Sequence, residues 1–304
     1  MFLANKLAIA KPIPLDLSPD PETQSAWLAN EAVSALIDEA TLTPKPALVD
    51  HRGSGAHHDL DLPLMLLSAA SLRPTFTRMA KAAERKTVGQ ELREQLACIG
   101  RHGETEMMAA TGGSNSHRGA IWALGLLIAG AVLDGQPDAA GIAGRAAAIA
   151  RHPDRYAPQT FSNGKRVSNK YGVGGARAEA EEGFPHAVTI GLPALREARG
   201  KGMPETAARI VALLSIMTSL NDTCLLHRGG LVALETARNG ARAVLTAGGI
   251  TTRAGMEAFE RLERELLALN ASPGGSADLL AVTLFLDRLD APKAPQSGSS
   301  CSWR

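Results

Sequence analysis

The chain has 304 residues, of which 45% are hydrophobic and 21% charged, and its 32 basic and 31 acidic side chains leave a formal net charge of +1. This length is enough for a substantial core and for one or two domains. The balance of charge excludes a global field for nucleic acid or an anionic membrane, so a site for anions must be local.

Cysteine usage and apolar runs indicate the compartment. Cys98, Cys224 and Cys301 are an odd number without a CxxC pair, which argues against a disulfide framework and structural zinc and favours a reducing cytoplasm. Lys6 and Lys11 interrupt the apolar N-terminus, and no signal-peptide cleavage site follows. The longest apolar run, Ala120 to Leu133, is too short to cross a bilayer. We expect neither a signal peptide nor a transmembrane segment.

Apolar residues recur at helical spacing almost everywhere, and β-branched or aromatic runs bounded by turns are missing. The sequence therefore predicts an all-α fold in one multi-helix domain over residues 21–290, with an N-terminal extension at 1–20 and a disordered tail at 291–304. The predicted helices are Glu22 to Ala40, Leu62 to Lys86, Val88 to Ala110, His117 to Leu133, Ala139 to Ala150, Pro204 to Leu226, Leu231 to Arg238, Thr251 to Leu269 and Ser276 to Leu289. Residues 151–174 are predicted to form a long polar loop.

Glycines gather at the junctions between these helices. The clusters are GSG at 53–55, TGGSNSHRG at 111–119, YGVGG at 171–175, HRGG at 227–230 and SPGG at 272–275. Glycine permits close backbone approaches, and helix N-termini attract anions, so such junctions suit a site where backbone N–H groups meet an anion. Each cluster taken alone is equally consistent with an ordinary turn or cap.

The first cluster runs into His57-His58-Asp59-Leu60-Asp61, which is consistent with a metal site, a catalytic base with its supports, or a helix cap. Asp61 precedes Leu62-Pro63, the position where an N-cap acid and a first-turn proline belong. His57, His58 and Asp59 lie outside the predicted helix, where a cap does not need them.

The second cluster places His117 and Arg118 in a first helical turn. A cation there opposes the helix dipole, so this placement is unfavourable unless an anion binds beside it. Upstream, Lys45 and Arg52 are within reach of a phosphate or are simply solvated charges.

The later clusters differ in what they indicate. YGVGG follows a polar segment rather than a strand, so it is no dinucleotide fingerprint, but it opens a helical stretch that carries Arg177. The HRGG segment resembles a C-cap with cations in the last turn. Asp222 lies in an apolar helical pattern, where it needs a cation, a metal or a substrate hydroxyl as partner. Asp278 falls in a first turn, where dipole compensation explains it.

Read together, four motifs resemble one family. They are PKPALVDHRGSGAHHDLDL, GGSNSHRGAIWALGLL, YGVGGARAEAEEGFPHA and LNDTCLLHRGG. The chain resembles the triphosphoribosyl-dephospho-CoA synthases from about Thr43 to Asp287, and GSGAHHDLDL with SPGGSADLLAVTLFL favours the malonate decarboxylase branch over the citrate lyase branch. Departures are Ala47 for glycine, Ser116-His117-Arg118 for Thr-His-Lys, and Cys224 for asparagine.

The resemblance implies an all-helical cytoplasmic pentosyltransferase that converts ATP and 3′-dephospho-CoA into 2′-(5″-triphosphoribosyl)-3′-dephospho-CoA and adenine. The product is a prosthetic-group precursor, passed to a transferase that acts on an acyl-carrier subunit. No nucleic acid or membrane partner is implied, and a homo-oligomer is allowed.

This chemistry assigns candidate roles to the residues at the junctions. A 2′-hydroxyl needs a carboxylate base or strong positioning, and an oxocarbenium-like centre needs a carboxylate, which Asp59 and Asp222 would supply. His57 or His117 would protonate or hydrogen-bond the departing adenine. Mg²⁺ would be the cofactor, with Asp61, Glu106 and Asp278 as candidate ligands. Candidate substrate-binding residues are Lys45, Arg52, Asn115, Arg118, Gly172, Gly174, Gly175, Arg177, His227, Arg228, Gly274 and Gly275.

Two alternatives belong to other classes. His58-Asp59 with a separate histidine and the later Asp222 loosely matches an HD-type metal-dependent nucleotide phosphohydrolase. A non-enzymatic assembly subunit that binds CoA or an acyl carrier is the second. Free adenine among the products separates the transferase from both.

Overall fold

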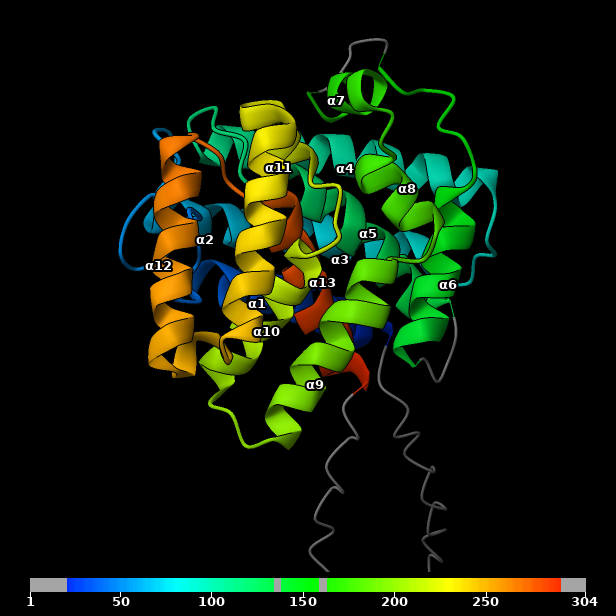
Figure 1. Ribbon diagram of the computed structural model, residues 1–304. Coiled ribbons are helices and arrows are strands. Elements are labelled where there is room, and N and C mark those ends of the chain that lie inside the picture. The colour runs from blue at the N-terminus through cyan, green and yellow to red at the C-terminus, as the bar shows by residue number, and fades with distance from the viewer. Residues whose placement is uncertain (1–20, 134–137, 159–162, 291–304) are drawn as a thin grey trace, which may run out of the picture.

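Helices supply the regular structure of the computed structural model, which describes residues 21–133, 138–158 and 163–290 (Figure 1). Within these ranges there is no strand, and the extended pairing is one isolated bridge between Asp50 and Gly53. The predicted all-α, single-domain fold is confirmed. The predictions for residues 1–20 and 291–304 lie outside the described residues.

Most helices follow one another through short junctions, and the longest connection, residues 42–61, joins the first helix to the second. Their bounds are α1 Pro21–Thr41, α2 Leu62–Ser71, α3 Arg73–Ala83, α4 Gln90–Ala110, α5 Arg118–Val132, α6 Ala139–Ala150, α7 Asn163–Tyr171, α8 Gly175–Glu181, a π-helix η1 His186–Gly191, α9 Leu192–Gly200, α10 Glu205–Met217, α11 Thr223–Thr246, a 3₁₀ turn η2 Gly249–Thr251, α12 Arg253–Ala268 and α13 Gly274–Asp290.

Helices α5 and α13 are the most deeply buried, because both are apolar on nearly every face. They pack against each other, and α13 also contacts α1, α10 and η1. In Figure 1, α11 and α12 run side by side along one edge of the molecule, and α7 lies across one end, against α11. The N-terminal ends of α5, α11 and α13 lie close together, since Ser276 of α13 donates to Asp222 at the start of α11 and Asp278 of α13 lies against Gly119 of α5.

Several helix bounds differ from the sequence-based predictions. The predicted helix Leu62 to Lys86 is two helices, since Pro74 starts a new one at α3. The predicted helix Pro204 to Leu226 ends at Met217, and α11 begins afterwards at Thr223. The predicted loop 151–174 contains α7, and α9 was not predicted.

The HRGG segment marks a break within α11. Gly230 takes φ 63° and ψ −154°, which is not helical, so residues 223–229 and 231–246 are two helical segments that meet at a kink. His227 and Arg228 lie in the last turn of the first segment, as the predicted helix end at this glycine pair requires. No helix in the described ranges is both long enough and apolar enough to span a membrane.

Helices α5 and α6 approach closely at Gly130, and this contact predicts opposite effects for two glycine substitutions. A Cβ at Gly130 would lie 2.6 Å from the carbonyl oxygen of Ile142, whereas a Cβ at the exposed Gly144 meets nothing within 4 Å. We expect Gly130→Ala to lower the free energy of unfolding by about 1–3 kcal/mol through overpacking. Gly144→Ala should raise it by about 0.5–1 kcal/mol. Urea unfolding of both variants checks this, and equal effects would contradict the close approach.

Candidate active site

The beginnings of α5, α11 and α13 meet the loop before α2, and we call this region the polar site; its residues are His57, Asp59, His117, Asp222, Arg228 and Asp278. His57 joins three of these segments. Its Nε2 lies 3.0 Å from Ser272 Oγ before α13, and its Nδ1 lies 3.0 Å from an Arg228 guanidinium nitrogen of α11. Arg228 also donates to the carbonyl of Ala56 at 2.7 Å. The loop is therefore fixed against two helices.

Asp222 is the N-cap of α11, not a residue inside a helix as the apolar pattern predicted. One carboxylate oxygen accepts from the backbone N–H groups of Cys224 and Gly275, and the other from the N–H and hydroxyl of Ser276. Its partners are thus N–H groups and a hydroxyl of the protein. Burial raises the pKa of Asp222, while these hydrogen bonds oppose the rise.

Asp278 lies in the second turn of α13, since this helix begins at Gly274. Its carboxylate lies so close to Gly119 of α5 that a Cβ there would overlap it. No described residue forms a hydrogen bond or ion pair with it. Burial, Glu39 and Asp222 together raise the pKa of Asp278 well above its ordinary value. The site therefore contains one acid that the described residues leave unsatisfied.

His117 is buried at the start of α5 and faces the same region. Its Nδ1 lies 2.7 Å from Ser68 Oγ, and its Nε2 has no hydrogen-bond partner among the described residues. Burial and the positive charge of Lys45 lower its pKa to about 4. Burial and Arg228 likewise lower the pKa of His57 to about 4. Both imidazoles are therefore neutral at pH 7.

The glycine turn at 172–175 adjoins the polar site. A Cβ at Gly175 would lie 3.2 Å from the Thr223 side chain at the start of α11. In the SPGG turn, a Cβ at Gly275 would lie 2.9 Å from Asp222, and one at Gly274 would lie 3.0 Å from Cys224. Side chains at these positions would occupy the space between the helix starts. The exposed Gly172 and Gly174 precede α8.

Several predicted substrate-binding cations are paired with acids instead. Lys45 is buried and donates to Glu39 at 2.6 Å. Arg52 binds Asp50 and Glu263 and lies over Phe259. The remaining pairs are Arg118 with Glu104 and Arg177 with Glu181.

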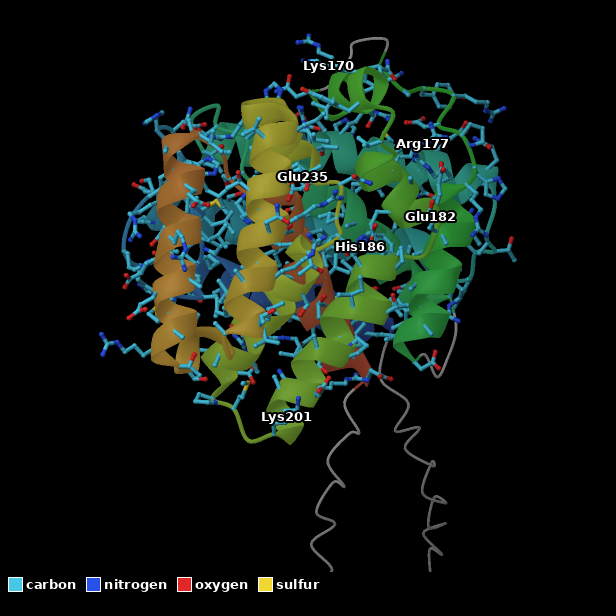
Figure 2. The ribbon with its side chains drawn as sticks, viewed as in Figure 1. Lys170, Arg177, Glu182, His186, Lys201 and Glu235 are labelled. Carbon is cyan, nitrogen blue, oxygen red and sulfur yellow. The ribbon has the colours of Figure 1, made fainter. Side chains whose placement is uncertain are left out.

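The Arg118 pair explains how a cation is tolerated at a helix start. The compensating anion for the first turn of α5 is the Glu104 carboxylate of the protein itself. Arg177, labelled in Figure 2, extends from α8 on the face turned toward the viewer, with Glu182 and His186. Asn115 and His227 are exposed.

The three predicted metal ligands occupy different environments. Asp61 caps α2 by accepting from the N–H of Leu64 at 2.9 Å, as one of the predicted alternatives had it. Glu106 binds Arg78 and Thr75. In the described part of the chain, no three His, Cys, Asp or Glu side chains are grouped so as to hold a metal ion.

Sequence reasoning missed several residues that build this region. Ser68, Ser272 and Ser276 bond the key side chains, and Glu39 neutralises Lys45. The partners of the three serines lie 49 or more residues away along the chain, so the sequence carries no sign of them. Glu39 is only six residues from Lys45, but no helical or capping pattern connects the two. Only Ser272 and Ser276 had a sequence signal, because they flank the glycine pair in SPGGSAD, one of the clusters predicted to line the site.

Known proteins similar to this chain are transferases. The protein named 2-(5″-triphosphoribosyl)-3′-dephosphocoenzyme-A synthase from Klebsiella pneumoniae is 53% identical over 88% of this chain and 96% of its own length. A protein named as a probable enzyme of this kind, from Stutzerimonas stutzeri, is 56% identical over 90% of this chain and 94% of its own.

The family follows from a wider match. The family model described as ATP:dephospho-CoA triphosphoribosyl transferase matches residues 25–297, and the chain belongs to this family. A crystal structure from Archaeoglobus fulgidus, assigned as a triphosphoribosyl-dephospho-CoA synthase, is 19% identical, with a TM-score of 0.50 over 74% of this chain and 99% of that one. This last likeness concerns the fold alone.

Asp222→Asn tests the connection between α11 and α13. An amide keeps one oxygen and places an NH₂ group at the other position, so either the N–H groups of Cys224 and Gly275 or the N–H of Ser276 lose their acceptor. We expect the free energy of unfolding to fall by about 1–3 kcal/mol, measured by urea unfolding. Asp138→Asn, at the exposed N-cap of α6, is the matched control and should be nearly neutral because asparagine caps as well. Equal stability of both variants would contradict the connecting role of Asp222.

The lowered pKa of His117 predicts a pH dependence of stability. The His117 imidazole has a pKa of 6.5 in the unfolded chain and about 4 in the folded chain. The stability that the neutral, buried imidazole contributes is therefore complete above pH 6.5 and is lost as the pH falls through 4. The loss is about 3 kcal/mol. We expect His117→Asn to unfold with a shallower pH dependence over this window than the wild type, in urea titrations at several pH values. His102→Asn, which removes an exposed imidazole, is the control; an unchanged slope in His117→Asn would contradict the burial argument.

Proposed function

We propose that the chain transfers the 5-triphosphoribosyl group of ATP to the 2′-hydroxyl of 3′-dephospho-CoA and releases adenine. A bond forms between the 2′-oxygen and the ribose C1 of ATP, and the C1–N9 bond breaks with its electron pair passing to adenine. The hydroxyl proton leaves through a base, and adenine takes up a proton. The observation that carries the proposal is the identity of more than half the residues over nearly the full length of synthases of this name.

Asp59 is the carboxylate that we propose as the base. It is exposed, lies 3.9 Å from His57 Nδ1, and its backbone carbonyl accepts a hydrogen bond from Ser114. An exposed carboxylate held at the edge of the site can reach a substrate hydroxyl. Asp222 has both oxygens bonded within the protein, so we propose that it acts by holding the helix starts in place.

A neutral histidine is the group that we propose to meet the leaving adenine. We assign Ser116 as the donor to Ser68 and Ser68 as the donor to His117 Nδ1, which places the imidazole proton on the unpartnered Nε2. His117 can then donate a hydrogen bond without being charged. Such a donor favours departure of the base by stabilising its developing negative charge. His57 is less suited, because both of its nitrogens already have partners.

The triphosphate would be bound by helix starts and by arginines that exchange partners. The backbone N–H groups at the beginnings of α5 and α8 are oriented for anions, whereas those of Gly275 and Ser276 in α13 already donate to Asp222. Arg118 and Arg177 are exposed beside the starts of α5 and α8, so a phosphate can replace or share their acidic partners. This retains the substrate-binding roles predicted for both arginines and for the glycines at 172–175.

Mg²⁺ bound to the triphosphate is the cofactor that we propose, and it would screen the charge of the phosphates. Magnesium needs one or two protein carboxylates when phosphates supply other ligands. Asp278 fits this role best, because its low exposure to water and the negative charges of Glu39 and Asp222 disfavour its ionised form, and a bound cation would stabilise that form. We further propose the malonate decarboxylase branch, with the product passed to a transferase for an acyl-carrier subunit in the cytoplasm, where the free thiols Cys98 and Cys224 persist.

Incubation with ATP, Mg²⁺ and 3′-dephospho-CoA, followed by mass spectrometry, tests the proposal. The expected products are free adenine and 3′-dephospho-CoA enlarged by a triphosphoribosyl group. ADP or inorganic phosphate without adenine would favour a phosphohydrolase. Binding of dephospho-CoA with no consumption of ATP would favour the non-enzymatic alternative.

Asp59→Asn tests the base directly. We expect kcat for adenine release to fall about 10²–10⁴-fold, because the amide cannot accept the hydroxyl proton. Stability should remain that of the wild type, since the Asp59 side chain is exposed. Asp138→Asn makes the same chemical change outside the polar site and should keep the wild-type rate. An unchanged kcat in Asp59→Asn would remove this carboxylate from the mechanism.

A further inference from the structure

A cavity lies beside the polar site, between α3, α4 and α5. It has a volume of about 180 Å³, and its walls are largely apolar, with Met79, Leu96 and Ile121 among them. Arg93, Trp122, Glu104 and Arg118 also line it. Since Arg118 and Gly119 are consecutive and Gly119 contacts Asp278, the cavity adjoins the polar site across the first turn of α5.

Arg93 is the unusual residue of this cavity. Its side chain is buried, with 8% of the residue exposed, and its guanidinium lies 4.7 Å from the centre of the Trp122 ring. Neither Nε nor Nη1 has a hydrogen-bond partner among the described residues. A buried guanidinium without acceptors is costly, and a bound ligand that supplies acceptors would recover part of this cost.

The other charges of the cavity are already compensated. Arg101 pairs with Asp154 at 2.6 Å, and Arg118 pairs with Glu104. Asp154 also lines the cavity, and its charge acts favourably on the Arg93 guanidinium. Among the described residues, however, no acid forms an ion pair with Arg93, so it is the cation of this small, mainly apolar space that lacks a direct acidic partner. A triphosphate, with several negative charges, does not match this lining. A flat group with apolar faces and acceptors on its edge does.

We propose that this cavity binds the purine base of an adenine nucleotide, with Arg93 donating to a ring nitrogen and Glu104 accepting from the exocyclic amino group. One oxygen of Glu104 bonds Arg118, and the other has no partner within the described ranges. The assignment of adenine rests on the proposed function, in which both substrates carry this base. The volume lies below the roughly 300 Å³ at the lower end of sites for whole drug-sized ligands, so the cavity suits a base and not a nucleotide.

The donor Arg93 and the acceptor Glu104 together make the cavity selective for one arrangement of hydrogen-bonding groups on the base. Adenine offers a ring acceptor next to an amino donor, whereas hypoxanthine replaces the donor with a carbonyl acceptor. With Arg93 at the ring nitrogen next to C6 and Glu104 at the group on C6, hypoxanthine would place its N1–H donor against Arg93 and its carbonyl against the carboxylate, so neither hydrogen bond could form. The cavity should therefore prefer adenine to hypoxanthine.

Isothermal titration calorimetry of free adenine with the full-length protein tests the inference without catalysis. We expect Arg93→Met to weaken adenine binding about tenfold or more, because a hydrogen bond to a charged group is lost. Its melting temperature should not fall, because a buried charge without an ion-pair partner is removed. Arg253→Met, an equivalent change at an exposed arginine of α12, should bind adenine as the wild type does.

Ala97→Leu is a second variant, which fills the cavity from its wall and should also abolish binding of adenine. Wild-type affinity in Arg93→Met, equal affinity for hypoxanthine, or displacement of adenine by inorganic tripolyphosphate would each overturn the inference.

Titration with ATP and with dephospho-CoA identifies which base enters the cavity. The nucleotide whose affinity falls in Arg93→Met is the one that places its base there, and no change for either would overturn the inference. Adenine release in the full reaction reports on the proposed function separately. A protein that releases adenine but binds it independently of Arg93 retains the function and loses this subsite.

Discussion

The carboxylate of Asp222 is the interaction on which the site depends. It accepts hydrogen bonds from the starts of α11 and α13, two helix ends that carry partial positive charge and would repel each other without an anion between them. Because α11 also carries Arg228, the same connection sets the position of Arg228 against His57. The loop, α11 and α13 therefore form one unit around a single buried acid.

The basic side chains near the polar site are each paired with an acid of the protein, so they do not produce a strong positive field. Lys45, Arg52, Arg118 and Arg177 are all paired with acids, as a near-neutral chain requires if it is to hold cations close together. Of these, Lys45 is buried with Glu39, so its pair is structural, whereas Arg118 and Arg177 are exposed. Exposed ion pairs contribute little to stability, so a phosphate can compete for these two arginines at low cost.

Helical periodicity and glycine junctions predicted the all-α fold and the capping of α2 by Asp61, since both depend on residues close in sequence. The break between α10 and α11 was missed because IVALLSIMTSLNDTCLL is apolar on both sides, as both helix ends are buried. The partners of Lys45 and Arg52 were missed for a different reason. Glu263 lies 211 residues after Arg52, and spacing along the chain carries no record of a pair that folding brings together over such a distance. Glu39 and Asp50 are close in sequence to Lys45 and Arg52, but both cations lie in a loop without a regular period that would indicate these pairs.

Two ionisable groups of opposite sign have no ion-pair partner among the described residues: Arg93, which is buried, and Asp278, which is partly buried. Both lie against α5. Asp278 contacts Gly119, and Arg93 lies over Trp122, three residues further along the same helix. A protein selected for stability alone would replace such groups with apolar ones, since burying an unpaired charge costs free energy. Their retention is explained if one ligand satisfies both, with its cation and phosphates at Asp278 and its base at Arg93. Gly119 has no side chain, which leaves room for the Asp278 carboxylate against the first turn of α5. The phosphates and the base of such a ligand would then both contact this first turn.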